Sequence, residues 1–321
     1  MRQIQTFQKL KTNLLTPPKI ESSYNCGKIR EQAILAITGR FGLSSKTVIQ
    51  NTLVISREAT NKIVNKMRKR GLLLTQRTFG CTDNQFFILS AEGIRQAEYL
   101  LNTELDLYAD LSKINERNLI HDLCTQLVML DLIKSGTTQN IVTERELRLC
   151  LDYRGNDKRI VDGLVLIGKQ WAAIEMETGN SKNKQKQEVR KPILNKYLQQ
   201  LQADDSLYQQ VYLYSHRQRF LTQIEKTNKQ LIEIPTNNFT STQQELIKSR
   251  LLYKSSSCVK LFELMYNSER KLTDSNAHKV DKLTYLKKLA ELEELTNNSQ
   301  DRIVQIRLAG FKEAGEILGL I

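Results

Sequence analysis

Apolar residues at helical spacing divide the first hundred residues into short helices followed by a hairpin. In the stretch after Ser56, Ala59, Ile63 and Met67 recur at helical spacing and Gly71 follows the last turn, so this stretch is predicted to be the third helix. Two runs of strand length then flank a turn-prone segment. The predicted elements are helices at 30–41, 44–53 and 56–70, strands at 72–78 and 85–89, and a helix after Ser90.

The second half alternates helical and strand-like segments. Residues 118–134 have a broad apolar face, and 138–149 contain a possible strand. Two apolar runs, 160–167 and 171–176, flank the pair Gly168-Lys169 and predict a hairpin. A helix at about 184–202 and a buried strand within 210–218 follow, and the remainder is predicted to be mostly helical.

Charge is distributed unevenly along the chain. Residues 1–100 carry 16 Lys and Arg against 6 Asp and Glu, which accounts for +10 of the net charge of +13. A basic N-terminal third predicts a polyanion as partner. The five cysteines form no CxxC pair, which argues against a zinc cluster or disulfide framework. No apolar run is long enough for a membrane span and no signal peptide is evident, so a cytoplasmic protein without membrane insertion is expected.

Three acidic residues lie within or directly after the hairpin at 160–176. Strand alternation places Glu175 and Glu177 on one face, and pairing of the two strands can bring Asp162 beside Glu175. Carboxylates gathered in this way repel one another unless a cation lies among them, and Mg²⁺ or Mn²⁺ prefers such oxygen ligands. Asp162, Glu175 and Glu177 are therefore the predicted metal ligands. The alternative is a solvated strand end with no ligand.

The order of three helices and a hairpin resembles the winged helix-turn-helix family over about residues 28–101. The resemblance implies that the third helix enters the major groove and that Arg77 and the hairpin turn contact phosphate or the minor groove. The residues predicted on the open face of that helix are Arg57, Thr60, Asn61, Asn65 and Arg68. A winged helix that binds protein instead of DNA is the alternative, and the basic charge of the segment argues against it.

The order helix, strand, hairpin, helix, strand resembles the core of the PD-(D/E)xK nucleases, an αβββαβ arrangement. Asp162 and Glu175 match the two acids of that pattern, but Glu177 stands where the pattern has lysine. A lysine from the next helix, such as Lys182, Lys184 or Lys186, is a candidate replacement, with Lys184 the catalytic candidate. The basic run 182–191, which includes Arg190, is predicted to bind backbone phosphate, with Lys182 and Lys186 as DNA contacts.

A winged helix joined to a core with an Asp…Glu-x-Glu signature is similar to the MOBC family of plasmid relaxases and to plasmid replication-relaxation proteins. The shared features are His121 early in a helix, Asp162-Gly163-Leu164, and Glu175-Met176-Glu177. The resemblance implies an α+β, metal-dependent enzyme that binds a plasmid transfer origin and nicks one strand. Its partners would be origin DNA and other mobilisation or coupling proteins, and it makes His121 a catalytic candidate.

A second class of function remains open: a winged-helix regulator of plasmid replication or transcription with a degenerate nuclease fold. Glu177 occupies the position at which the nuclease pattern has lysine, and this departure favours the regulator. The presence of the three acids favours the enzyme. In both cases the expected organisation is an arm at 1–27, a winged helix at 28–101, a nuclease-like core at 118–235 and a helical extension at 236–321.

Overall fold

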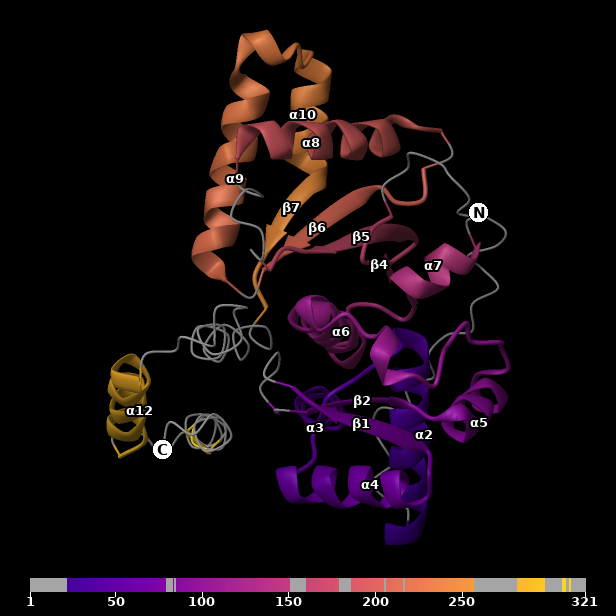
Figure 1. Cartoon of the computed structure of the whole chain (residues 1–321). Helices are drawn as coiled ribbons and strands as arrows, with labels where there is room; N and C mark the ends of the chain where they lie inside the picture. The colour runs from indigo at the N-terminus through magenta and orange to yellow at the C-terminus, as the bar shows by residue number, and fades with distance from the viewer. Residues whose placement is uncertain are drawn as a thin grey trace.

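The fold is a mixed α/β arrangement in which an N-terminal module of helices and a hairpin packs against a five-stranded sheet (Figure 1). This computed structural model describes residues 22–78, 83, 85–150, 160–178, 186–204, 206–215, 217–256, 282–297, 308–309 and 312. Among the described helices, none is both long enough and apolar enough to cross a membrane.

The N-terminal module contains the three helices and the hairpin in the predicted order. Serine side chains cap its helices: Ser45, Ser56 and Ser90 each accept a hydrogen bond from the main-chain N–H three residues later. Ser44 also pairs with Phe87 as an isolated bridge, which adds a third segment to the hairpin. The elements are α2 (Ser23–Phe41), α3 (Lys46–Leu53), α4 (Arg57–Lys69), β1 (Leu73–Arg77), β2 (Gln85–Leu89) and α5 (Ala91–Leu101).

The larger sheet has the order β3-β4-β5-β6-β7, antiparallel from β3 to β5 and parallel from β5 to β7. Helix α6 covers one face, and α8 and α9 cover the other (Figure 1). The elements are α6 (Leu119–Lys134), β3 (Ile141–Thr143), α7 (Glu144–Cys150), β4 (Gly163–Ile167), β5 (Gln170–Met176), α8 (Gln187–Gln202), β6 (Gln210–Tyr214), α9 (Gln218–Glu233), α10 (Ser241–Arg250) and β7 (Leu251–Lys254). Three short 3₁₀ turns lie at Leu111–Lys113, Glu116–Asn118 and Pro235–Asn237, and α12 spans Lys282–Asn297.

Two boundaries from the sequence need correction. The N-terminal arm was expected to extend to residue 27, with the first helix from residue 30, but α2 already begins at Ser23. The core was expected to end at residue 235, but β7 pairs with β6 and extends the sheet to Lys254. Its four residues are too few to show a strand periodicity, so the hydrophobic pattern alone does not predict this strand.

Helix α6 joins the N-terminal module to the sheet. It is apolar nearly all round, with Leu123, Leu127 and Met129 fully or almost fully buried, because α3 packs on one side and β4 and β5 on the other. One hydrophobic core therefore runs from α2 through α6 into β5. The two predicted domains share this core.

Buried polar contacts reinforce the same junction. Arg40 of α2 donates from Nε and Nη2 to both carboxylate oxygens of Glu146 at 2.5 and 2.8 Å, and from Nη2 to the main-chain oxygen of Ile141. The Gln126 amide accepts from Ser44 and donates to the main-chain oxygen of Leu43. A bidentate pair of this kind fixes orientation as well as distance, so the module and the sheet are held in one arrangement.

Candidate functional site

Helix α4 presents the most exposed polar face of the N-terminal module. It lies on the side of the module away from the five-stranded sheet (Figure 1), and contacts α2, α3 and β1. Its buried positions are Thr60, Val64 and Met67. The opposite face is centred on Glu58, Lys62, Asn65 and Lys69, all of which are exposed.

Thr60 was predicted on the open face, and this placement is wrong. Its side chain is fully buried, and Oγ1 donates to the main-chain oxygen of Ser56. The helix has apolar residues at both 63 and 64, and the core takes Val64 while Ile63 is only partly buried. This rotation brings Lys62 and Lys69 to the centre of the exposed face, where the sequence analysis had not placed them.

Arg57 holds the hairpin turn instead of projecting freely. Its Nη2 lies 2.5 Å from Oδ1 of Asp83, whose side chain is fully buried. The same carboxylate accepts hydrogen bonds from the main-chain N–H and the hydroxyl of Thr47 at the start of α3. Asp83 thus joins the turn, α3 and α4, and Arg57 neutralises its charge.

The other predicted DNA contacts differ in accessibility. Asn65 and Arg68 of α4 are exposed, as is Arg77 at the end of β1, and Asn61 is half-buried. Lys186 is exposed just before α8. Lys182 and Lys184 lie outside the described residues.

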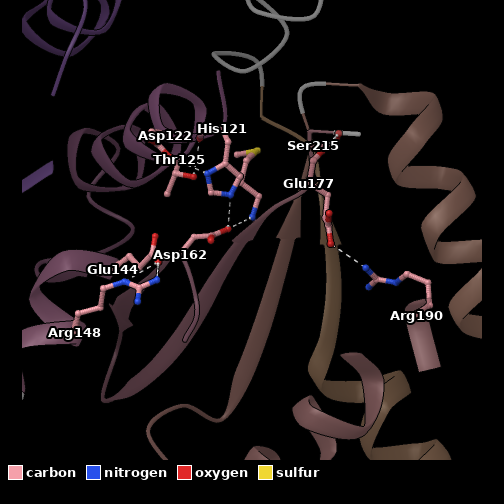
Figure 2. Close-up of polar contacts among 10 residues, drawn as sticks. His121, Asp122, Thr125, Glu144, Arg148, Asp162, Glu177, Arg190 and Ser215 are labelled. Atoms are coloured by element: carbon pink, nitrogen blue, oxygen red, sulfur yellow. Dashed lines mark hydrogen bonds and ion pairs between the residues drawn. The ribbon is translucent and has the colours of Figure 1, made fainter. Parts of the chain in front are cut away.

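His121 and Asp162 come together where α6 meets the start of β4 (Figure 2). The imidazole Nε2 lies 3.1 Å from Oδ2 of Asp162, and Nδ1 lies 3.0 Å from Oδ1 of Asp122. Burial acting alone would lower the pKa of His121. The negative charge of Asp162 and the hydrogen bonds to both carboxylates outweigh burial and raise this pKa to about 11. The ring is therefore an imidazolium at neutral pH.

Asp162 also closes the end of the hairpin. Its Oδ2 accepts a hydrogen bond of 2.6 Å from the main-chain N–H of Met176, and its main-chain oxygen accepts from Glu144. Gly163 pairs with Ile174, so continuing the register by one residue places Asp162 opposite Glu175. Glu175 itself is buried. The ladder itself ends at Gly163, and the predicted contact between the side chains of Asp162 and Glu175 stays a prediction.

Glu177 has a different environment from the one predicted. Its Oε1 accepts a hydrogen bond of 2.8 Å from Nη1 of Arg190 on α8, and both side chains are almost entirely buried (Figure 2). Arg190 also donates from Nε to Asn228 of α9, whose amide donates to the hydroxyl of Tyr253 on β7. Burial raises the pKa of Tyr253 to about 12. Arg190 was assigned to a phosphate-binding run, but it points into the protein.

The three predicted ligands do not form one Mg²⁺ or Mn²⁺ site in this arrangement. Arg190 already neutralises Glu177, while Asp162 contacts His121. In the part of the chain that the structure describes, no group of three or more His, Cys, Asp or Glu side chains is placed to hold a metal ion. The ligand roles of Asp162 and Glu175 stay predictions.

A cavity of about 240 Å³ lies next to His121, between the N-terminal module and the sheet. Phe41, Leu43 and Ile114 form apolar parts of its wall. Its acidic, basic and hydroxyl side chains come from α6, α7, the connector and the segment before β4, and include Lys113, Asp122, Thr125, Glu144, Arg145, Arg148 and Asp162. Arg148 of α7 pairs with Glu144 (Figure 2). The sequence marked this region only through the proximity of Glu144 to the acidic hairpin.

In comparisons with protein-family models, curated proteins and solved structures, no significant match to the chain was found.

Proposed function

We propose that this protein binds duplex DNA through α4 and the β1–β2 hairpin, and that it is an origin-binding protein of plasmid mobilisation or replication. The observation that carries the proposal is the exposed face of α4, where Lys62, Asn65 and Lys69 lie side by side at helical spacing. Lysine side chains bind the phosphate groups of DNA, and asparagine can form hydrogen bonds with the edge of adenine.

The surrounding structure supports a winged-helix reading. Helices α2, α3 and α4 precede a hairpin to which Ser44 adds a bridge, and Arg77 is exposed on the hairpin. Lys66 and Arg70 are ion-paired with Glu31 of α2, which fixes α4 against α2. Among the described residues, no salt bridge joins Lys62 or Lys69 to an acid, so their charges are available to phosphate.

Binding can be tested by selecting sequences from a random duplex pool and measuring fluorescence anisotropy on the enriched and the random DNA. Asn65→Ala is expected to weaken binding to the enriched sequence by about 1–3 kcal/mol and to change binding to random DNA little, because a base contact is specific. Equal losses on both DNAs would make Asn65 a backbone contact. Failure of the selection to enrich any sequence would contradict the proposal of an origin-binding protein.

Strand nicking is a second candidate function, and the register of the hairpin favours it. The order α6, β3, β4, β5, α8, β6 follows the αβββαβ order of the PD-(D/E)xK nucleases, with α7 inserted. Asp162 lies opposite Glu175 at the end of the hairpin, beside His121. These are the positions at which relaxases of the MOBC type, which the sequence resembles, are expected to carry their acids.

The nicking assay uses supercoiled plasmid carrying the enriched sequence, incubated with the protein and Mg²⁺, Mn²⁺ or EDTA. A nicking enzyme would produce open circles with wild type and none with Asp162→Asn or Glu175→Gln. Duplex binding of these variants should remain within about twofold of wild type, since α4 lies on the side of the N-terminal module away from the five-stranded sheet. Open circles in equal amount from all three proteins would show that the acids take no part, and no open circles from wild type would leave DNA binding as the function.

A further inference from the structure

The cavity beside His121 is lined by Arg145, a cation that forms no direct ion pair with a carboxylate in the described part of the chain. The charged side chains around it are otherwise arranged in pairs or groups: His121 lies between Asp122 and Asp162, and Arg148 pairs with Glu144. Arg145 makes a hydrogen bond from Nη2 to the main-chain oxygen of Asp106. No carboxylate among the described residues lies within ion-pair distance of Arg145.

The surroundings of Arg145 hold its side chain at the cavity wall. Gly42, which ends α2, has φ of +84°, and a Cβ added there would lie 3.2 Å from Cδ of Arg145. Glycine is therefore favoured both by the backbone conformation and by the closeness of the arginine stem. Burial lowers the pKa of Arg145 from its usual value, and the negative charges of Asp106, Glu144 and Asp122 act in the opposite direction.

A second cation, Lys113, lines the same cavity. Lys113 lies in the connector between α5 and α6, is exposed, and lines the cavity together with Asn115 and Thr125. Asn115 adds a polar side chain to the two positive charges, whereas the hydroxyl of Thr125 already donates to the main-chain oxygen of His121. An arginine fork, an ammonium and neutral polar groups around a small cavity form a favourable environment for an anionic oxygen.

We propose that this cavity binds a phosphodiester group of a single DNA strand, with the Arg145 guanidinium and the Lys113 ammonium contacting the phosphate oxygens. The inference rests on the proposed function only in taking DNA as the partner. The cavity of about 240 Å³ is smaller than the roughly 300–1,000 Å³ of drug-sized sites. A recessed space of this size can hold one phosphate group of a separated strand. An intact duplex is too wide to enter it. The bound phosphate lies next to the His121–Asp162 pair.

The test is fluorescence anisotropy with a labelled oligothymidine and with a labelled duplex, on the full chain. Lys113→Gln and Arg145→Gln are each expected to weaken oligothymidine binding about 3- to 10-fold and to reduce the log–log salt slope by about 0.7, the value for one phosphate contact on a single strand. Duplex affinity should change less than about twofold. Lys226→Gln is the matched control, because Lys226 is an exposed lysine of α9 on the opposite face of the sheet.

Thermal unfolding of each variant separates loss of binding from loss of fold. Arg145 also contacts the main chain of Asp106, whereas Lys113 is exposed, so Lys113→Gln remains informative even if Arg145→Gln unfolds. Oligothymidine affinity equal to wild type in Lys113→Gln and in any folded Arg145 variant would overturn the proposal. An equal loss of single-strand and duplex binding would also overturn it, because the cations would then belong to a general footprint.

Competition distinguishes the possible sources of the phosphate. Inorganic phosphate and thymidine monophosphate are each titrated against bound oligothymidine. The proposal predicts that both displace it only at concentrations far above that of an unlabelled oligonucleotide. Displacement by inorganic phosphate as readily as by the oligonucleotide would identify a free-phosphate site and contradict strand binding. Variants of α4 that lose duplex binding but keep the oligothymidine response would show that the two sites act independently.

Discussion

The exposed face of α4 and the end of the five-stranded sheet both carry charged residues, but they use them differently. On α4, Lys62 and Lys69 are exposed and lie beside Asn65. At the sheet, Glu177 and Arg190 are almost fully buried and neutralise each other. Exposed lysines remain available to a polyanion even with Glu58 on the same face, whereas buried ions must satisfy one another because water does not solvate them. The comparison teaches that a charged motif predicts a ligand only where its charges are not already paired.

The largest expected effect comes from breaking the buried pair at the sheet. Arg190→Met leaves the Glu177 carboxylate buried without its cation and should lower the free energy of unfolding by about 3–5 kcal/mol. Urea denaturation measures this loss. The double variant Glu177→Gln, Arg190→Met should recover most of it, because no buried charge is left alone. A loss below about 1 kcal/mol in the single variant would show that Glu177 does not depend on Arg190.

The next effect lies within the N-terminal module and separates a structural arginine from an exposed one. Arg57→Ala removes the cation beside the buried carboxylate of Asp83, so the free energy of unfolding should fall by about 1–3 kcal/mol. Arg68→Ala, an exposed substitution on the same helix, should change it by less than about 0.5 kcal/mol. Faster amide hydrogen exchange in β1 and β2 of the Arg57 variant would localise the effect. Equal stability of the two variants would contradict the structural role of Arg57.

A pH titration gives the most gradual effect, spread over several pH units, and sharpens the comparison at His121. The folded-state pKa of about 11 lies above the usual value of about 6.5. The contribution of protonated His121 to the free energy of unfolding is therefore complete below about pH 6.5 and is lost as pH rises towards 11. Between pH 7 and 9, wild type should lose stability relative to His121→Gln by at most about 1.4 kcal/mol per pH unit. Parallel stability curves for the two proteins would refute the raised pKa.

Apart from α7, the sequence was sufficient to predict the order of helices and strands through β6, because hydrophobic periodicity and turn residues act locally. The hairpin of β4 and β5 follows from two apolar runs around Gly168, whose φ is +62°. Which face of α4 is buried was not predictable in the same way, since Ile63 and Val64 are adjacent and either could face the core. Only the packing of α4 against α2 and β1 decides that Thr60 is buried and Lys62 exposed.

The candidate site was predicted less completely than the fold. The contact of His121 with Asp162 brings together two residues that the resemblance had singled out. The pairing of Glu177 with Arg190 depends on how α8 crosses the sheet, which no local pattern records. The roles of Arg145 and Lys113 depend on a cavity between three segments of the chain. Such features arise from tertiary packing and are invisible to periodicity.

The measurement that tests the central claim most directly is the salt dependence of duplex DNA binding. The variant Lys62→Ala, Lys69→Ala is compared with wild type and with the control Lys226→Ala, Lys248→Ala, which removes two exposed lysines from α9 and α10. If α4 binds the duplex, the slope of log affinity against log salt should become shallower by about 1.8 in the α4 variant, about 0.9 for each lost phosphate contact. The control should keep the wild-type slope. Equal slopes and affinities in all three proteins would contradict DNA binding through α4.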